Sequence, residues 1–415
     1  MKDYNYFNTL LVQNVGSKTR AISPVIASSA AFGYEDAQEA EGIFMGQVNN
    51  PLYARVGNPT SSKLESIIAK MEGGLGAITT SSGMGALSMV MTAYLKAHDE
   101  VLCIGGFFGG TYTLVNETMK RFGVENSFCQ TDDFSHIEGK LKSGIHMVMI
   151  ETVGNPSLEL PDLKRIIELC NQYDTLLVVD NTVTPLTMRP LEMGADIVIH
   201  STTKAMSGHS SALGGVAVFR AVEENDDKLL HKKYSNMHPI IKKMGKKAMI
   251  AIAKKRAMRD MGMSSNAFGS FLTMLGLETL ALRLERVNSS IPIIATRLEK
   301  ELPSNIKVSH PSLASHKYHE RYLSDFNKAC GPIITLECGD KETAFKLLNR
   351  LKLVTQTANI GDNRTLALHM SSTIYRDFTK ETQNYLGVTD GIIRISIGLE
   401  DPKVIIEDFL QASQQ

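Results

Sequence analysis

The 415-residue sequence contains no tryptophan, only five cysteines and no excess of charge of either sign. The cysteines form no C-x-x-C pair and their number is odd, which disfavours a disulfide framework and predicts reduced, mostly buried thiols. The 44 basic and 44 acidic side chains cancel, which argues against nucleic acid and against an anionic membrane surface as partners. His200 and His209 do not lie at metal-ligand spacing from a cysteine or a carboxylate, so we expect no metal site.

Long hydrophobic runs are absent as well. The longest stretches, such as 147–150 and 176–179, are far shorter than the roughly 18 residues that a membrane span requires. The first residues, with Lys2 and Asp3, lack the basic-then-apolar pattern of a signal peptide. We therefore expect a cytoplasmic protein without a membrane span. Hydrophobic residues at 43% and charged residues at 21% are typical of globular chains, and the length predicts about two to four domains, or one large domain with appendages.

One segment departs from this neutral balance. Residues 232–259 contain ten lysines and arginines, and the acid Asp260 follows directly. Charge runs of this kind are usually solvated surface. The alternative interpretation is an anion-attracting rim around an active site.

Between about residues 60 and 220, short apolar runs alternate with helix-length segments. This pattern is typical of a parallel sheet with helices on both faces, so we predict an α/β core. The segment 161–172 is a candidate helix, because it opens with Pro-Asp and spaces its apolar residues along one face. The candidate strands are Ala77–Thr80, Glu100–Ile104, Met147–Glu151, Leu176–Asp180, Ile197–His200 and Gly215–Phe219.

The alternation of strand-like and helix-like segments ends on either side of this core. Residues 1–60 carry turn residues and few periodic elements, which indicates an arm. Residues 61–262 form the predicted α/β domain. Residues 263–415 begin with a predicted long amphipathic helix, about 273–290, and continue as a smaller α+β domain.

Three polar segments follow predicted strands, where ligands bind in open α/β sheets. The first is the turn 81–86, which precedes an apolar helical pattern. Small residues there, including Ser82 and Gly83, would let backbone N–H groups and the helix dipole bind a phosphate. Such turns also use glycine and serine simply for tight packing.

The second segment places Asp180 directly after the apolar strand 176–179. Burial of this carboxylate would be costly unless a cation or a strong donor faced it. The alternative role for Asp180 is a helix N-cap.

The third segment brings Lys204 to the end of the strand 197–200, behind the hydroxyl residues Ser201, Thr202 and Thr203. A half-buried lysine loses proton affinity and becomes an amine nucleophile able to form an imine, while Ser201 and Thr203 can donate to a phosphate. The alternative is a lysine that extends from the strand end to water. Together the three segments predict pyridoxal 5′-phosphate, which presents a phosphate, a ring nitrogen and an aldehyde.

The same residues carry a family resemblance. The sequence resembles the pyridoxal-phosphate enzymes of cysteine and methionine metabolism, the cystathionine γ-synthase-like family, over nearly its whole length. The resemblance runs from Tyr53-Ala-Arg-Val-Gly-Asn-Pro-Thr60 to Ile393-Arg-Ile-Ser-Ile-Gly398. It implies the type I fold of these transferases, with a mostly parallel seven-stranded sheet, helices on both faces and a smaller C-terminal α+β domain.

The resemblance also implies roles for individual residues. Lys204 would hold the cofactor covalently and move the α-proton, and Asp180 would pair with the ring nitrogen. Phe108 would stack on the ring, while the phosphate would be bound by Ser82, Gly83, Met84, Ser201 and Thr203. Tyr53 and Arg55 would reach the phosphate of a neighbouring subunit, which makes a homodimer the minimal active unit and predicts a homotetramer. The α-carboxylate of an amino-acid substrate would be bound by Arg394, Asn155 and Asn359. The alternative for Arg394 is a surface arginine on an edge strand.

Several positions depart from the family pattern. The family's Tyr-Gly-Gly-Thr is Phe108-Gly109-Gly110-Thr111 here, so the ring remains while the phenol that assists the departing γ-group is lost. Tyr53, Tyr112 or a water could replace it. Gly110 stands where methionine γ-lyases have a cysteine. The family's His-Ser-Asp after the lysine is His209-Ser210-Ser211 here, and its late His-Pro-Ala…His segment is His369-Met370-Ser371…Tyr375.

Within the family, the segment 358–363 and the segment 276–283 most resemble O-acetylhomoserine sulfhydrylases. The resemblance therefore implies γ-replacement on an O-activated homoserine, in which sulfide or a thiol gives homocysteine or a methionine-like product. The first alternative is a γ-lyase that converts methionine, homocysteine or a related amino acid to 2-oxobutanoate and ammonia. The second is a non-catalytic anion-binding α/β protein.

Overall fold

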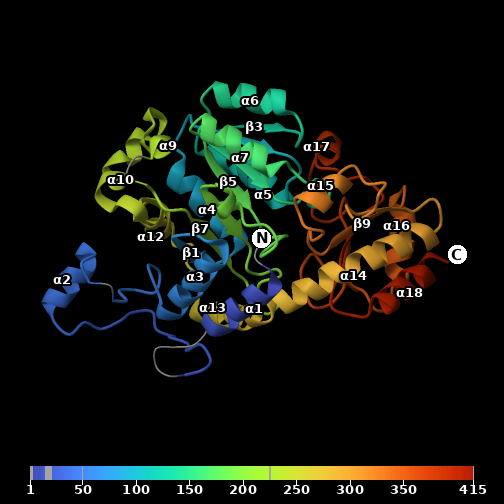
Figure 1. Cartoon of the computed structure of the whole chain (residues 1–415), viewed down its shortest axis with the longest axis horizontal. Coiled ribbons are helices and arrows are strands. Elements are labelled where there is room, and N and C mark those ends of the chain that lie inside the picture. Colours follow the sequence, from blue (N-terminus) through green and yellow to red (C-terminus); the bar gives the residue numbers. More distant parts are fainter. Residues whose placement is uncertain (1–2, 15–20, 49, 224–225, 415) are drawn as a thin grey trace.

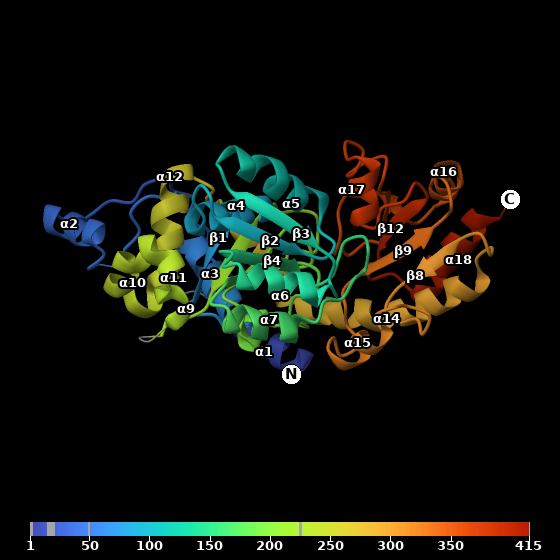
Figure 2. The same cartoon turned by 90° about the horizontal axis from the view of Figure 1, so that it is seen from above.

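The computed structural model describes residues 3–14, 21–48, 50–223 and 226–414 and contains two sheets (Figures 1 and 2). The larger sheet has seven strands in the order β1-β7-β6-β5-β4-β2-β3. Its strands are β1 (Gly76–Thr80), β2 (Glu100–Ile104), β3 (Glu125–Cys129), β4 (Met147–Glu151), β5 (Leu176–Asp180), β6 (Ile197–His200) and β7 (Gly215–Phe219). Only β7 runs antiparallel to its neighbours β1 and β6, so the predicted fold class is confirmed.

Sequence analysis did not predict one strand of this sheet, β3. β3 has the composition Glu-Asn-Ser-Phe-Cys and lies at the sheet edge, where four of its five residues keep some exposure. An edge strand of this kind does not show the continuous apolar run that predicted the buried strands.

Helices cover both faces of the seven-stranded sheet (Figure 2). α3, α6 and α7 pack on one face, and α4, η1 and α11 pack on the other. The helices and helical turns of this region are α1 (Tyr4–Asn14), α2 (Ala37–Met45), α3 (Pro59–Glu72), α4 (Gly83–Tyr94), α5 (Gly109–Thr113), η1 (Leu114–Met119), α6 (Phe134–Lys142), α7 (Leu163–Gln172), α8 (Pro190–Met193), α9 (Asp227–Leu230), η2 (Lys232–Met237), α10 (His238–Met244), η3 (Gly245–Lys247), α11 (Ala248–Ala253), η4 (Lys254–Met258) and α12 (Arg259–Met261). All five cysteines are buried and free, as predicted.

The second sheet has five strands in the order β10-β11-β12-β9-β8. These are β8 (Lys307–Ser309), β9 (Ile333–Glu337), β10 (Thr355–Gln356), β11 (Leu366–His369) and β12 (Ile392–Ser396). The accompanying helices are α13 (Ala267–Glu278), α14 (Leu280–Glu301), α15 (His319–Ser324), α16 (Lys341–Arg350), α17 (Lys380–Tyr385) and α18 (Pro402–Ser413). The boundaries 60/61 and 262/263 between the three predicted regions stay a prediction.

The single helix predicted over 273–290 is wrong, because two helices meet at Thr279. Thr279 leaves helical geometry (φ −111°, ψ 5°), and α13 and α14 bend by 57° there. The side chain of Arg283 donates to the Gly276 carbonyl and holds the bend. Among the described residues no single helix is long and apolar enough to cross a membrane, and only this bent pair reaches that length and composition when taken together.

The basic segment 232–259 mixes anchored and solvated side chains. Lys233 donates to the carbonyls of Ile145 and Tyr173, whereas the lysines at 242, 243, 246, 247 and 255 are exposed. None of these side chains lines the cavity described below. The geometry therefore favours solvated surface over a rim around the active site.

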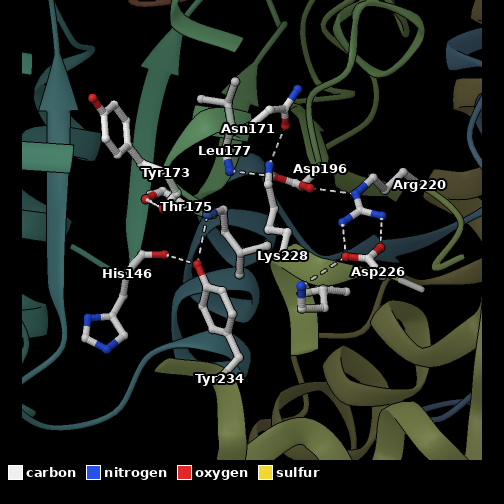
Figure 3. A network of polar contacts seen from close by, with 12 residues as sticks. His146, Asn171, Tyr173, Thr175, Leu177, Asp196, Arg220, Asp226, Lys228 and Tyr234 are labelled. Atoms are coloured by element: carbon white, nitrogen blue, oxygen red, sulfur yellow. Dashed lines mark hydrogen bonds and ion pairs between the residues drawn. The ribbon is translucent and has the colours of Figure 1, made fainter. Parts of the chain in front are cut away.

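A buried ionic network at the amino-terminal ends of the strands connects Asp196, Arg220, Asp226 and Lys228, which precede the basic segment (Figure 3). Asp196, which is fully buried, accepts from the backbone of Leu177 at 2.8 Å, from Lys228 at 2.8 Å and from Arg220. Burial opposes the charge of Arg220, but Asp196 and Asp226 together raise its pKa. This network lies at the end of the strands opposite to the three polar segments.

We expect Asp196→Asn to lower the free energy of unfolding by about 3–5 kcal/mol, because it leaves buried cations without their shared anion. Urea unfolding would measure the change. Glu301→Gln in the exposed pair with Arg297 is the matched control and should leave the urea midpoint unchanged. Equal midpoints for Asp196→Asn and the native chain would show that the network contributes nothing to stability.

Candidate functional site

A cavity of about 200 Å³ lies at the carboxyl ends of the strands β1, β4, β5 and β6. Residues that follow these strands meet there with side chains from the second sheet. The lining residues are Ser82, Gly83, Met84, Leu87, Phe108, Thr111, Glu151, Asn155, Asp180, Thr182, Val183, Ser201, Thr203, Lys204, Leu213, Ala358, Ile360 and Arg394. The structure thus brings all three polar segments into one cavity.

The turn after β1 starts α4 with a serine cap. Ser82 Oγ accepts from Gly85 N at 3.0 Å, which leaves the N–H groups of Gly83 and Met84 without a partner inside the helix. Gly83 packs so closely on the residue after β6 that a Cβ there would lie 2.7 Å from the Cβ of Ser201. Only glycine fits, and the result is a narrow cradle of donors at the positive end of α4.

Thr203 is also at this cradle, but its hydroxyl is engaged within the chain. Thr203 Oγ1 donates to the Gly214 carbonyl at 3.1 Å and accepts from Gly214 N at 3.0 Å. Thr182 Oγ1 accepts from Ser201 N at 2.8 Å and joins the ends of β5 and β6. These contacts fix the loop on which Ser201 and Lys204 lie.

Asp180 ends β5 inside the cavity. Its carboxylate accepts from Thr182 N at 2.9 Å, and burial raises its pKa in spite of that bond. No helix begins after it in the described chain until Pro190, so the helix-cap alternative is wrong. A half-buried carboxylate of this kind favours a cationic ligand.

Glu151 is a second carboxylate at the carboxyl ends of the strands, and sequence analysis assigned it no role. It pairs with Asp180 in the register of β4 and β5, and its Oε1 accepts from Phe108 N at 2.9 Å. Burial, together with the neighbouring Asp180, raises the pKa of Glu151 well above its usual range and so favours the neutral form of this carboxyl. Its position directly after a buried strand, like that of Asp180, was the available signal.

The opposite face of the same strand ends carries a further buried pair. His200 Nε2 lies 2.7 Å from Glu72 Oε1, and Asn181 donates to the same oxygen at 3.2 Å. Both His200 and Glu72 are fully buried. The pair ties α3 to the ends of β5 and β6, directly behind Asp180.

Lys204 reaches into the cavity from the loop after β6. Its Nζ donates to Asn359 Oδ1 at 2.7 Å, so the amine does not extend to water and that alternative is wrong. Burial, together with Arg394, lowers the pKa of Lys204 to about 8. A substantial fraction of this amine is therefore neutral near pH 7.5 and can act as a nucleophile.

Arg394 enters the cavity from β12, the middle strand of the second sheet. It is 2% exposed and donates to Asn155 Oδ1 at 3.3 Å and to the Asn359 carbonyl at 3.2 Å. The alternative of a surface arginine on an edge strand is therefore wrong. Burial lowers its pKa to about 10, and no carboxylate forms an ion pair with it among the described residues. Its guanidinium is suited to an anionic group of a ligand.

The aromatic residue of the cavity is Phe108, and Gly110 makes room for it. A Cβ at position 110 would lie 2.7 Å from the Phe108 ring, so a cysteine there would displace the ring. Tyr112 packs against Phe128 and Phe378 outside the cavity and does not replace the missing phenol. Tyr375 is fully buried and donates to the Asn155 carbonyl at 2.8 Å, which orients Asn155.

Tyr53 and Arg55 do not line this cavity. Tyr53 is 46% exposed, and the Arg55 guanidinium donates to the Arg259 carbonyl. Helix α2, from the same arm, projects away from both sheets (Figure 1) and exposes Phe44 and Met45.

The residues fit pyridoxal 5′-phosphate on three grounds of their own chemistry. The cradle at Gly83 suits a phosphate, the half-buried Asp180 favours a cation, and Lys204 is an amine of lowered pKa in the same cavity. The fold and this site define a pyridoxal-phosphate-dependent enzyme.

Comparison with known proteins identifies its family. The family model described as Cys/Met metabolism PLP-dependent enzyme matches residues 8–414, and the chain belongs to this family. Homocysteine synthase of Schizosaccharomyces pombe is 33% identical over 98% of both chains. L-methionine gamma-lyase of Fusobacterium nucleatum is 33% identical over 94% of this chain and 93% of its own.

A solved structure supports the same assignment. The protein described as an O-acetylhomoserine (thiol)-lyase of Campylobacter jejuni superposes with a TM-score of 0.91 at 29% identity, over 99% of this chain and 100% of that one, and contains N′-pyridoxyl-lysine-5′-monophosphate. The cofactor and the enzyme class that the sequence predicted are confirmed, so a non-catalytic anion-binding protein is excluded.

Proposed function

We propose that this enzyme catalyses γ-replacement on an O-activated homoserine. With O-acetylhomoserine and sulfide, the γ-carbon–oxygen bond breaks, a γ-carbon–sulfur bond forms, and homocysteine and acetate leave. With a thiol the product is methionine-like. The observation that supports this proposal most directly is that one cavity is lined by Lys204, Asp180 and Arg394, in a chain similar over 98% of its length to a homocysteine synthase.

The residues of the large sheet would perform the chemistry. Pyridoxal 5′-phosphate, when bound, supplies an electron sink beside the α-carbon of the amino acid. Lys204 would hold the cofactor at its aldehyde and then move the α-proton on its Nζ. Asp180 would keep the ring nitrogen protonated, and Phe108 would stack on the ring. The N–H groups and hydroxyls of the phosphate cradle would come from Ser82, Gly83, Met84 and Ser201, and Thr203 would join them by exchanging its bond to the Gly214 carbonyl for one to the phosphate.

The second sheet would provide recognition of the amino acid. Arg394 would bind the α-carboxylate through two parallel hydrogen bonds, because it lacks an acidic partner of its own in the described chain. Asn155 and Asn359 already contact Arg394 and would complete this subsite.

The arm would complete the active site of a neighbouring subunit. The exposure of Tyr53 and the projection of α2 support this role, since exposed apolar side chains such as Phe44 favour burial at an interface. Tyr53 and Arg55 would reach the partner's phosphate, and the Tyr53 phenol would assist the leaving γ-group in place of the phenol lost at Phe108. A homodimer would be the minimal active unit and a homotetramer the assembled form. A cytoplasmic location stays a prediction.

A γ-lyase is the second candidate, and the 33% identity to a methionine gamma-lyase favours it. In that reaction water replaces the sulfur nucleophile in the overall balance. Methionine and water give methanethiol, 2-oxobutanoate and ammonia. The same residues serve both reactions, so the outcome depends on which molecule intercepts the activated substrate.

Product analysis distinguishes the two candidates. We expect the purified holoenzyme with O-acetylhomoserine and sulfide to form homocysteine and acetate in equal amounts. The matched reaction contains methionine or homocysteine without a nucleophile and is expected to release little 2-oxobutanoate. If 2-oxobutanoate and ammonia were the main products of both reactions, the enzyme would be assigned as a γ-lyase and γ-replacement would be rejected.

A further inference from the structure

A chain of hydrogen bonds runs from Lys204 to the buried carboxylate of Asp362, in the segment that precedes β11 of the second sheet. Lys204 Nζ donates to Asn359 Oδ1 at 2.7 Å, and Asn359 Nδ2 donates to Ser210 Oγ at 2.9 Å. Ser210 Oγ in turn donates to Asp362 Oδ2 at 2.5 Å. Asp362 is 4% exposed and forms an ion pair of 2.7 Å with Arg364. None of the roles proposed above uses Ser210 or Asp362.

The direction of this chain follows from the group at its end. Burial acts against the charge of Asp362, but Arg364 and the Ser210 hydroxyl lower its pKa, so the carboxylate is ionised and can only accept. Ser210 must then give its single proton to Asp362, and its oxygen is left to accept from the amide nitrogen of Asn359. The Asn359 oxygen consequently points to Lys204.

The backbone around Ser210 holds this geometry in place. Ser210 has φ 53°, in the left-handed region, which directs its side chain across to the segment 359–364. Asn363 N donates to the Gly208 carbonyl at 2.9 Å, and Arg364 donates to the His209 carbonyl at 3.3 Å. The loop after Lys204 is thereby fixed to the strand-connecting segment of the second sheet.

We propose that Ser210 and Asp362 are positioning residues, which fix the Asn359 amide with its oxygen rather than its nitrogen toward the Lys204 amine. The oxygen stabilises a protonated amine and, for a neutral amine, takes one N–H so that the orientation of the lone pair is set. A reversed amide would present N–H groups to the same amine and disfavour its proton. This inference rests on the proposed function only in that Lys204 is taken as the reacting amine.

Other charges also act on the Lys204 amine and on Asp362, at the far end of the hydrogen-bond chain. Arg394 faces Lys204 from β12. Asp180 of β5 and Glu151 of β4 line the same cavity. Arg283 of α14 and Arg364 interact with Asp362. A test must therefore change the hydrogen bond without changing a charge.

Ser210→Gly meets this condition, because glycine adopts φ 53° without strain, and the substitution removes the –CH2OH side chain with its hydroxyl and no charge. The readout is the pH midpoint at which Lys204 of the cofactor-free full-length chain reacts with an amine-specific reagent, followed by peptide mapping. We expect a midpoint near pH 8 in the native chain. In Ser210→Gly it should fall by about half a pH unit to one unit, because the Asn359 oxygen is no longer fixed.

Two comparisons make the result decisive. Ser211→Gly removes the neighbouring hydroxyl and should leave the midpoint unchanged. In an Asn359→Ala background, Ser210→Gly should have no further effect, since the link between Ser210 and Lys204 is gone. An unchanged midpoint in Ser210→Gly, or an equal fall in the Asn359→Ala background, would overturn the proposal. The measurement involves no substrate, so a failure of γ-replacement leaves it unaffected.

Discussion

The Lys204→Ala variant is expected to lose turnover while it keeps the fold of the native chain. Lys204 is the amine that lines the cavity with a pKa lowered to about 8, and it would serve both as the attachment point of the cofactor and as the group that moves the α-proton. Loss of a positioned acid–base group alone costs about 10²–10⁴-fold in rate. Loss of both roles should reduce kcat by at least about 10⁴-fold.

The fold should survive because the side chain of Lys204 makes one hydrogen bond, to Asn359, and no ion pair is formed by it among the described residues. Far-ultraviolet circular dichroism and the urea midpoint would test this. The native protein should be yellow, and borohydride reduction followed by peptide mapping should place the fixed label on Lys204. Lys204→Ala should take up no label.

Lys246→Ala is the matched control for this experiment. Lys246 is exposed in the basic segment and does not line the cavity, so its loss should change neither colour nor turnover. A label fixed on a lysine other than Lys204 in the native chain would contradict the assignment.

Local sequence patterns predicted the large sheet and the residues that follow its strands. Asp180 comes directly after a continuous apolar run, and Lys204 follows the next one within five residues. The carboxyl ends of parallel strands meet at one edge of the sheet. The physical reason for this success is that both signals lie within a few neighbouring residues.

Contacts between distant segments were beyond this kind of prediction. The Asn359 amide meets Lys204 across 155 positions of sequence, and nothing in either segment specifies the other. The pairing of Glu151 with Asp180 depends on strand register, which a single sequence of two apolar runs does not define. At the break, Arg283 donates to Gly276 and also to the distant Ala205 carbonyl at 2.7 Å, a contact that the amphipathic pattern does not encode, so the pattern alone suggested one helix.

The interior position of Arg394 also required the structure. A five-residue strand with one arginine is compatible with an edge, and only the strand order shows that β12 lies between β9 and β11. There the guanidinium is 2% exposed and directed into the cavity, because β12 brings it next to Asn155. The resemblance to a family had implied this role; the fold explains how the side chain reaches it.

Asp180→Asn is expected to reduce kcat by about 10²–10³-fold, the usual cost of removing one charge aligned with a reacting group. Asparagine keeps the size of the side chain and an oxygen for Thr182 N, so the hydrogen bond of 2.9 Å can persist. What is lost is the negative charge that would keep the ring nitrogen of the cofactor protonated. Steady-state kinetics and cofactor affinity by absorbance titration would separate the effect on rate from the effect on binding.

Glu151→Gln is the matched control, because the two carboxylates are neighbours in the register of β4 and β5. Burial and Asp180 raise the pKa of Glu151 and favour its neutral form, which a neutral glutamine reproduces, and the glutamine oxygen can still accept from Phe108 N. We expect kcat within about threefold of the native value, since no charge is removed. If Glu151→Gln lost as much activity as Asp180→Asn, the working negative charge would lie on Glu151 and the assignment of the two carboxylates would have to be exchanged.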